Sequence, residues 1–420
     1  MVGQNESDGR VEGIRRAPSD ADEDDIEHVL SALGSEGARR RRSAALAISA
    51  VSGERPRALA EHVEELGDAL DGGPQVRGQA VRAIADVATV APERVSPVAE
   101  DLRVCLGIDA DVTERSALQA LTALAEIDSE PLVDLAPALC SVVQRGSNLE
   151  ESLVRALALL DETLPEAADE VATLVPSLLD LLESVDVDSP TPGSVDGELE
   201  EFVEPDRENL VVQRASARKL AGVLLARVAA ERPAAVSDRV DDLATFLDDS
   251  DVVVRKAAVD ALHSVATADP ATLADGDSVR TLADRLGSDE ADEVRGRVAA
   301  ILGTVTMERP EATLSQRETL VPAATALLDA EETAVRSEAV KLLASIAAVE
   351  PEAVSQAVPE LRARLEDGDS LVRARALWAL RDLQATEAEP TIRELAKDDP
   401  DPDVRALAKE TLEEFGHAAR

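Results

Sequence analysis

The chain contains 420 residues, of which 85 are Asp or Glu and 43 are Lys or Arg, so its formal net charge is −42. A surface with this charge repels the phosphate backbone, and an aromatic content of 1% leaves almost no side chains on which bases could stack, so we expect no nucleic-acid partner. Hydrophobic residues make up 45% of the chain, which is enough to build a core, and the chain is therefore not expected to be disordered as a whole.

The excess of acidic residues has two interpretations. It keeps a surface hydrated in multimolar salt, which also fits a chain that has only five Lys. Alternatively, it forms an acidic docking face for a basic partner. We favour hydration, because the Debye length is about 3 Å at about 1 M salt and a negative field then steers little.

The N-terminal segment 1–19 has no apolar run, so we expect no signal peptide there and interpret it as a disordered tail. No stretch of about 18 apolar residues follows, so no membrane insertion is expected. Cys105 and Cys140 do not make a disulfide framework, which favours a reduced, cytoplasmic environment.

A repeat runs through the rest of the chain. An Arg opens each recognisable unit, a small or apolar residue follows three positions later, and apolar residues follow seven and ten positions later. These offsets lie on one stripe of an α-helix. The eight anchors are Arg41, Arg77, Arg218, Arg255, Arg295, Arg336, Arg373 and Arg405.

Proline separates the units. Six of the eight anchors have Pro fifteen residues later, where it ends one helix and tolerates the first turn of the next. The segment after it carries a second apolar stripe, as at Leu361 and Leu365. The pattern therefore predicts that each unit consists, in chain order, of a helix A, an acidic turn, a helix B that begins near the Arg, and a proline. The first helix A is expected near 24–33, and two degenerate units near Ala117 and Glu150 bring the predicted B helices to ten.

An insertion at 184–209 divides N-terminal repeats at 20–183 from C-terminal repeats at 210–420. It holds nine acidic residues, one basic residue and three prolines, which is typical of a solvated loop. Phe202 within it is a candidate anchor for a partner, but we favour a plain flexible loop.

Acidic turns precede several B helices, as at 248–251, 367–369 and 398–403. An Asp at the N-cap accepts a hydrogen bond from a free backbone N–H and meets the positive end of the helix dipole. A calcium loop would require oxygen ligands at EF-hand spacing and a Glu at position twelve, which these turns lack. We therefore interpret the Asp residues as caps.

The strings DDPDPDVRALAKETLEEFG (398–416), DSDVVVRKAAVDALHSVA (249–266) and DGDSLVRARALWALRDL (367–383) resemble HEAT repeats, and among them the short HEAT-like type named after phycobilisome lyases. The resemblance covers about 20–183 and 210–420. It implies an all-α, right-handed α–α superhelical solenoid of about ten helix pairs, similar to armadillo proteins, with B helices lining the concave face where partners bind. One helix pair cannot bury its apolar stripe alone, so stacking of neighbours is also expected on physical grounds.

The resemblance carries three further implications. It points to a halophilic archaeon as the source and to taxis or motility signalling as one setting for the protein. It also implies a ladder of Asp and Arg side chains between successive repeats, with the pairs Asp251/Arg255, Asp369/Arg373 and Asp403/Arg405 as members.

Motifs of catalysis and metal binding are missing from the sequence. It has no C-x-x-C, H-E-x-x-H, G-x-S-x-G or Gly-rich phosphate loop. Its four His lack the following Glu found in HEAT-like deoxyhypusine hydroxylase, and it lacks the basic, aromatic surface of HEAT-like DNA glycosylases. We therefore predict no enzyme activity, catalytic residue, cofactor or metal. The alternative is a HEAT-like lyase or chromophore-handling enzyme with a closed pocket.

Positions five and eight after each Arg lie off the core stripe of helix B and are varied, as expected of a surface that meets solvent or a partner. Trp378 and Arg381 are three residues apart and belong to types enriched at binding hot spots, although Trp378 could instead pack beneath the last repeats. The candidate binding residues are Arg82, Asp260, His263, Lys341, Trp378, Arg381 and Phe202. The sequence thus predicts a non-enzymatic cytoplasmic scaffold or adaptor that binds protein partners.

Overall fold

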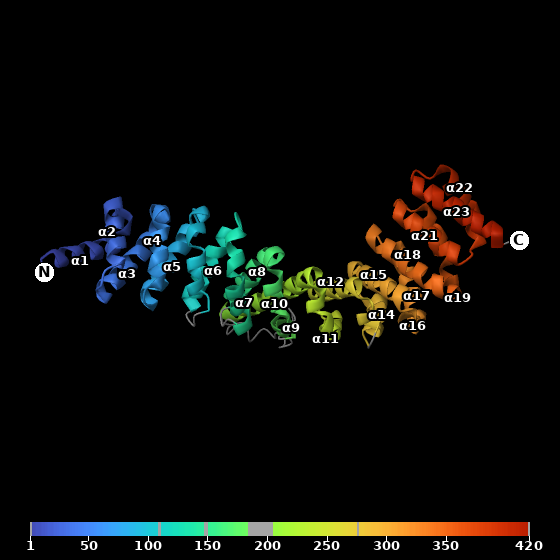
Figure 1. The fold of residues 1–420 in the computed structure, drawn as a ribbon, viewed down its shortest axis with the longest axis horizontal. Coiled ribbons are helices and arrows are strands. Elements are labelled where there is room, and N and C mark those ends of the chain that lie inside the picture. The colour runs from blue at the N-terminus through green and yellow to red at the C-terminus, as the bar shows by residue number, and fades with distance from the viewer. Residues whose placement is uncertain (1, 108–110, 147–149, 184–204, 275–276, 419–420) are drawn as a thin grey trace, which may run out of the picture. The chain divides into compact units, whose positions relative to one another are not determined.

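The computed structural model describes residues 2–107, 111–146, 150–183, 205–274 and 277–418 (Figure 1). Within these ranges the regular structure is helical and contains no strand. The chain divides into two compact units, 1–224 and 225–420, which are described separately. The boundary lies inside helix α10 (Pro205–Glu231).

The B helices are present at every predicted anchor. In the first unit they are α3 (Ala38–Glu54), α5 (Pro74–Ala88), α6 (Asp111–Ala125), α8 (Glu150–Ala172) and α10, which continues into the second unit. In the second unit they are α12 (Val252–Ala268), α15 (Asp292–Glu308), α18 (Thr333–Val349), α21 (Ser370–Asp382) and α23 (Pro402–Ala418). The predicted stripe is buried, as Ala258, Leu262 and Val265 of α12 illustrate.

The A segments are broken into short pieces, where the repeat pattern predicts single helices. Proline opens several of these pieces, because it lacks an N–H and tolerates the first turn of a helix. Pro310 opens the piece Pro310–Leu314 and Pro351 opens the piece Pro351–Val354, whereas Pro322 lies inside the unbroken piece Arg317–Ala326. The α-helical pieces are α2 (Glu23–Leu33), α4 (Val63–Asp68), α7 (Ala136–Arg145), α9 (Val175–Glu183), α11 (Val240–Thr245), α13 (Ala271–Ala274), α14 (Ser278–Ser288), α16 (Pro310–Leu314), α17 (Arg317–Ala326), α19 (Pro351–Val354), α20 (Val358–Ala363) and α22 (Glu389–Asp398).

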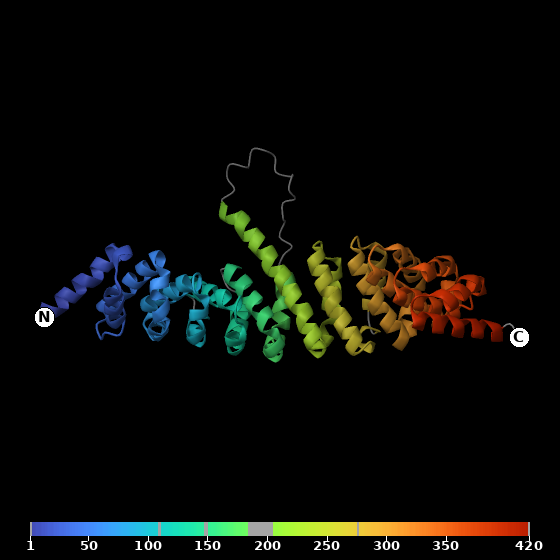
Figure 2. The same cartoon turned by 90° about the horizontal axis from the view of Figure 1, so that it is seen from above.

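Short stretches of 3₁₀-helix complete these segments. They are η1 (Pro18–Asp20), η2 (Pro56–His62), η3 (Ala69–Asp71), η4 (Pro92–Arg94), η5 (Ser96–Val98), η6 (Glu100–Cys105), η7 (Glu130–Leu135), η9 (Pro233–Ala235), η10 (Ser237–Arg239), η11 (Phe246–Asp248), η12 (Leu327–Asp329), η13 (Ser355–Ala357), η14 (Arg364–Glu366) and η15 (Thr386–Ala388). Within each unit, the A segments and B helices stack in chain order (Figure 2).

The prediction of a disordered tail at 1–19 is wrong. Residues Val2–Arg16 form helix α1, in which Val11 and Ile14 lie three positions apart and are buried. Arg10 Nε also lies 2.5 Å from Asp25 Oδ1 at the start of α2. Two apolar residues in an otherwise polar segment are too few to reveal a helical period. The composition of the segment therefore predicts a disordered tail instead of a helix.

The insertion predicted at 184–209 is only partly within the described ranges. Residues 184–204, including Phe202, lie outside them, so the loop and its proposed anchor stay predictions. Residues 205–209 are in α10 instead of the loop.

Asp residues cap the B helices α12 and α21, as predicted for their turns. Asp251 Oδ1 accepts the Val253 N–H at 2.8 Å, and Asp369 Oδ1 accepts the Leu371 N–H at 2.9 Å. Asp251 and Asp369 are therefore caps and are not the acidic members of the ladder that the resemblance implies. Arg405 of the last B helix donates to the carbonyl oxygens of its own turn, Asp399 and Pro400.

The ladder joins the Arg of one repeat to an Asp in the turn of the next repeat. In each case the Arg Nε lies 2.8 Å from an Asp Oδ2, and both side chains are largely buried. The pairs are Arg255–Asp289, Arg336–Asp367 and Arg373–Asp399. The resemblance thus identified Arg255 and Arg373 as members, but the acidic partners lie one repeat further along the chain.

Candidate functional site

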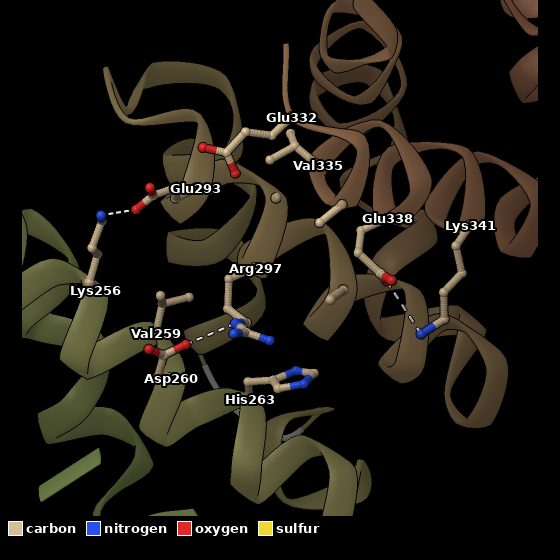
Figure 3. Close-up of a pocket in the computed structure, with 13 residues that line it drawn as sticks. Lys256, Val259, Asp260, His263, Glu293, Arg297, Glu332, Val335, Glu338 and Lys341 are labelled. Carbon is tan, nitrogen blue, oxygen red and sulfur yellow. Dashed lines mark ion pairs between the residues drawn. The ribbon is translucent and has the colours of Figure 1, made fainter. Parts of the chain in front are cut away.

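A groove follows the exposed side of four successive B helices in the second unit, α12, α15, α18 and α21. Its first part, which we call the charged section, is a cavity of about 470 Å³ between α12, α15 and α18 (Figure 3). Its second part, the apolar section, is a cavity of about 540 Å³ between α15, α18 and α21. Lys341 of α18 lines both parts, so the two sections are neighbours along the same helices.

Small residues allow α15 and α18 to approach closely beneath the charged section. A Cβ placed on Gly296 would lie 2.9 Å from Val335 Cγ2 and 3.2 Å from Val335 Cα, which is closer than side chains tolerate. Gly296 and Ala300 also line the cavity. The small residues Gly296 and Ala300 therefore allow α15 and α18 to pack closely beneath the cavity.

Ion pairs between neighbouring helices occupy the charged section. Lys256 of α12 pairs with Glu293 of α15, and Arg297 Nε of α15 lies 2.8 Å from Asp260 Oδ1 of α12 (Figure 3). These pairs link successive repeats on the groove side, much as the Arg–Asp ladder links them at the turns. Because the opposite charges face each other at short range, the cations Lys256 and Arg297 are already matched within the protein.

His263 is the titratable ring of the charged section. It points from α12 into the groove beside Arg297 (Figure 3). Burial lowers its pKa, and the positive charge of Arg297 lowers it further. Its buried Nδ1 atom has no hydrogen-bond partner among the residues that the structure describes. The imidazole is therefore neutral at pH 7 and adds no positive charge to the groove.

Large exposed apolar side chains gather in the apolar section. Met307 of α15 is 69% exposed, Val349 of α18 is 47% exposed and Trp378 of α21 is 43% exposed. Ala344 and Ala348, one turn apart on α18, lie between them and line the same cavity. Apolar groups of this size exposed together are typical of an interaction site, and Trp378 is not a core residue.

Polar side chains surround this apolar floor. Arg375 is held in place, because its Nη1 donates to Ser337 O and Oγ, each at 2.8 Å, and to Glu338 Oε1 at 2.9 Å. Arg381 is held less tightly: its Nε lies 3.3 Å from Asp382 Oδ1 and 3.7 Å from Glu414 Oε2. The rim therefore combines one fixed and one loosely held guanidinium.

Five of the seven predicted site residues line this one groove. Asp260 and His263 lie in the charged section, Trp378 and Arg381 in the apolar section, and Lys341 in both. Arg82 is exposed on α5 in the first unit and does not line either section, and Phe202 lies outside the described ranges. A binding role for these residues stays a prediction.

The sequence analysis missed groove residues one turn before and after the chosen positions. Lys256 and Gly296 stand one position after their anchor Arg, and Met307 stands twelve after Arg295. Offsets of 1, 5, 8 and 12 form one continuous helical stripe. Extending the stripe at offsets five and eight by one turn in each direction would have found them.

The two cysteines are structural. Both are buried, Cys105 in η6 and Cys140 in α7, and both lie in A segments. Burial raises the pKa of the Cys105 thiol to about 11 and that of Cys140 to about 12. Within the described ranges, no three His, Cys, Asp or Glu side chains are grouped to hold a metal ion, and no helix is both long and apolar enough to cross a membrane.

The fold defines an all-α repeat solenoid. A family model of HEAT repeats matches residues 358–419, and a model of the HEAT-like repeat matches residues 38–102. No curated protein matches the chain.

Solved structures share this fold at low sequence identity. An engineered protein has 21% identity and a TM-score of 0.66, with 94% of this chain and 99% of that chain covered. A structure concerning the phosphorylation-controlled interaction between cadherin and beta-catenin has 13% identity and a TM-score of 0.60, with 97% and 96% covered. At these identities the likeness shows the fold alone.

Proposed function

We propose that the protein is a non-enzymatic scaffold that binds a protein partner through the apolar section of the groove. The observation that supports this function is the exposure of Trp378 beside Met307 and Val349 on a surface otherwise rich in charge. Aromatic and Met side chains are enriched at the centres of protein interfaces, where they are covered on binding.

The chemistry of the groove favours binding over catalysis. A catalytic site needs a nucleophile or a positioned acid and base. Here the carboxylate of Asp260 is paired with Arg297 and that of Glu338 with Arg375, and the thiols lie buried elsewhere. The neutral imidazole of His263 has no hydrogen-bond partner at Nδ1 within the described ranges that would position it as a base. We do not extend the function to taxis or motility signalling, because no side chain in the described ranges distinguishes that class of partner.

The test is capture of partners by the immobilised protein from an extract of its own cells at high salt, read by mass spectrometry. Wild type is compared with the double variant Trp378→Ala/Arg381→Ala. Leu371→Ala is the matched control, because Leu371 is 50% exposed on the same helix α21 but does not line the groove.

We expect a partner that wild type and Leu371→Ala retain equally and that the double variant loses at least tenfold, with the thermal unfolding of the double variant still cooperative. The same set of captured proteins with all three would contradict the function. Loss of cooperative unfolding in the double variant would mean that Trp378 and Arg381 are structural.

A further inference from the structure

We propose that the apolar section selects a peptide segment in which carboxylates flank a bulky apolar side chain. This inference rests on the proposed protein-binding function and adds the chemistry of the partner. It is based on three properties of the section: a floor that accepts an apolar group, a rim that carries unused hydrogen-bond donors, and a neighbouring section whose cations Lys256 and Arg297 are already paired.

The floor has room for one large side chain. Ala344 and Ala348 are four residues apart and therefore lie one above the other on α18, and both line the cavity. Met307 on α15 and Trp378 on α21 stand on either side and remain largely exposed. A Leu or Phe side chain placed over the two alanines would cover apolar surface of both walls, which is the arrangement found at interface hot spots.

Three side chains of the rim, Lys341, Arg381 and Trp378, carry hydrogen-bond donors that are unused within the described ranges, beside one acid, Asp382. Lys341 Nζ lies 3.5 Å from Glu338 Oε2 but makes no hydrogen bond, and Arg381 uses only its Nε within the described ranges. Trp378, which is 43% exposed and lines the same cavity, carries a further donor in its indole N–H. Ammonium, guanidinium and indole groups cannot accept hydrogen bonds, whereas an ionised carboxylate accepts only. A carboxylate is therefore the complementary group.

The acids of the chain use only part of this capacity, and Glu338 Oε2 lies 3.5 Å from Lys341 Nζ. Glu338 is held by Arg375 at 2.9 Å, while Asp382 and Glu414 reach only the Nε of Arg381, at 3.3 and 3.7 Å. In the charged section, by contrast, Arg297 and Asp260 face each other at 2.8 Å. Complementarity to an incoming carboxylate is thus concentrated in the apolar section.

The overall charge of −42 sets the salt dependence of this recognition. An acidic segment is repelled by the whole chain at long range and attracted only by the rim at contact. Salt screens the long-range term first, because the Debye length is about 8 Å at physiological ionic strength and about 3 Å at 1 M. The association rate with an acidic segment should therefore rise as KCl is added, whereas the rate with a basic segment should fall.

Trp378 is the only Trp of the chain, so its intrinsic fluorescence reports directly on this section. We suggest titrating the full-length protein with three dodecapeptides that share a Leu-Phe core and contain neither Trp nor Tyr. Their flanks consist of Asp and Glu, of Asn and Gln, or of Lys. Each is tested with wild type, Arg381→Gln and Lys256→Gln, the last being a matched control in the charged section.

We expect the carboxylate peptide to shift Trp378 emission to the blue and to bind about tenfold more tightly than the carboxamide peptide. Arg381→Gln should reduce that ratio to about threefold or less, and Lys256→Gln should leave it unchanged. Equal affinity for carboxylate and carboxamide peptides, or tighter binding of the Lys peptide at Trp378, would overturn the inference.

Absence of any effect of the carboxylate peptide would overturn it as well. The capture experiment separates this failure from that of the proposed function. A partner lost in Trp378→Ala/Arg381→Ala, with no preference for carboxylate peptides, would mean that the groove binds proteins by another chemistry. Conversely, a carboxylate preference without a Trp378-dependent partner would contradict the scaffold function alone.

Discussion

Arg373 of α21 and Asp399, which precedes α23, form a two-point ion pair between consecutive repeats. Nε lies 2.8 Å from Oδ2 and Nη2 lies 2.8 Å from Oδ1, and the side chains are only 8% and 1% exposed. Arg373 Nη1 also donates to the carbonyl oxygen of Asp367 at 2.9 Å. A single guanidinium thus fixes its own turn and the turn of the next repeat, and Arg255 and Arg336 repeat the arrangement.

Replacing the acid of this pair should destabilise the second unit strongly. Asp399→Ala leaves the buried Arg373 without its counter-charge, which costs about 3 kcal/mol or more in the free energy of unfolding. Asp398→Ala next to it should cost less than about 0.5 kcal/mol, because Asp398 is exposed and only weakly paired with Lys397. Urea denaturation of the two variants measures the difference, and equal midpoints would show that the ladder does not stabilise the fold.

The ladder also predicts how stability depends on pH. Burial raises the pKa of Asp289, Asp367 and Asp399, but the hydrogen bonds from their Arg partners and from backbone N–H groups outweigh it, and the pKa of each lies below the ordinary 3.8. A carboxylate whose pKa is lower in the folded state than in the unfolded state stabilises the folded protein at every pH above its unfolded pKa. This stabilisation is lost as the pH falls from 3.8 toward the lower pKa of the folded state.

Lowering the pH also relieves repulsion among the other carboxylates, which changes the stability of every variant. The contribution of the ladder is therefore measured as the difference in unfolding free energy between wild type and a ladder variant. The gap in unfolding free energy between wild type and Asp399→Asn should be widest above about pH 5 and should narrow below about pH 4. Urea titrations at several pH values measure it. A gap that stays constant to pH 3 would contradict the pKa assignment.

Much of the fold was predictable from the offsets after each Arg, because a buried helical stripe constrains residue size at positions three, seven and ten. The acidic partners of the ladder were not, since an Asp four residues before an Arg looks like its partner, as with Asp369 and Arg373. The acid that Arg373 contacts, Asp399, is distant in the chain, and only stacking of the repeats brings the two together.

The groove was partly predictable for a related reason. Offsets five and eight identified Lys341, Trp378 and Arg381, but whether a side chain on that stripe is exposed depends on how closely the next helix approaches. Gly296 permits the close contact of α15 with α18, and Met307 stays 69% exposed at the far end of the same helix. Neither consequence can be read from one helix alone.

The close approach at Gly296 can be tested directly. Gly296→Ala would place its Cβ 3.2 Å from the backbone Cα of Val335, and such overpacking should cost about 1–3 kcal/mol. Gly303→Ala on the same helix is the control, because its Cβ would lie 3.6 Å from Leu342 Cα, an ordinary contact, and Ala favours helix over Gly. Thermal melting should show a lower midpoint for Gly296→Ala only; similar midpoints would contradict the close approach.

The cysteines should be unreactive in the folded protein. With pKa values of about 11 and about 12, Cys105 and Cys140 remain thiols at pH 8, and both are buried. A thiol-specific chromogenic disulfide should therefore react only as the protein unfolds, and quickly in urea. Rapid modification of either cysteine in the native state would contradict its burial.

Quenching of Trp378 fluorescence by acrylamide, with and without the captured partner, tests the central claim most directly. Alone, Trp378 is 43% exposed and should be quenched efficiently. In the complex it should be shielded, with a quenching constant several-fold lower. An unchanged constant in a complex shown to be saturated would mean that the partner binds elsewhere and that the apolar section is not the binding site.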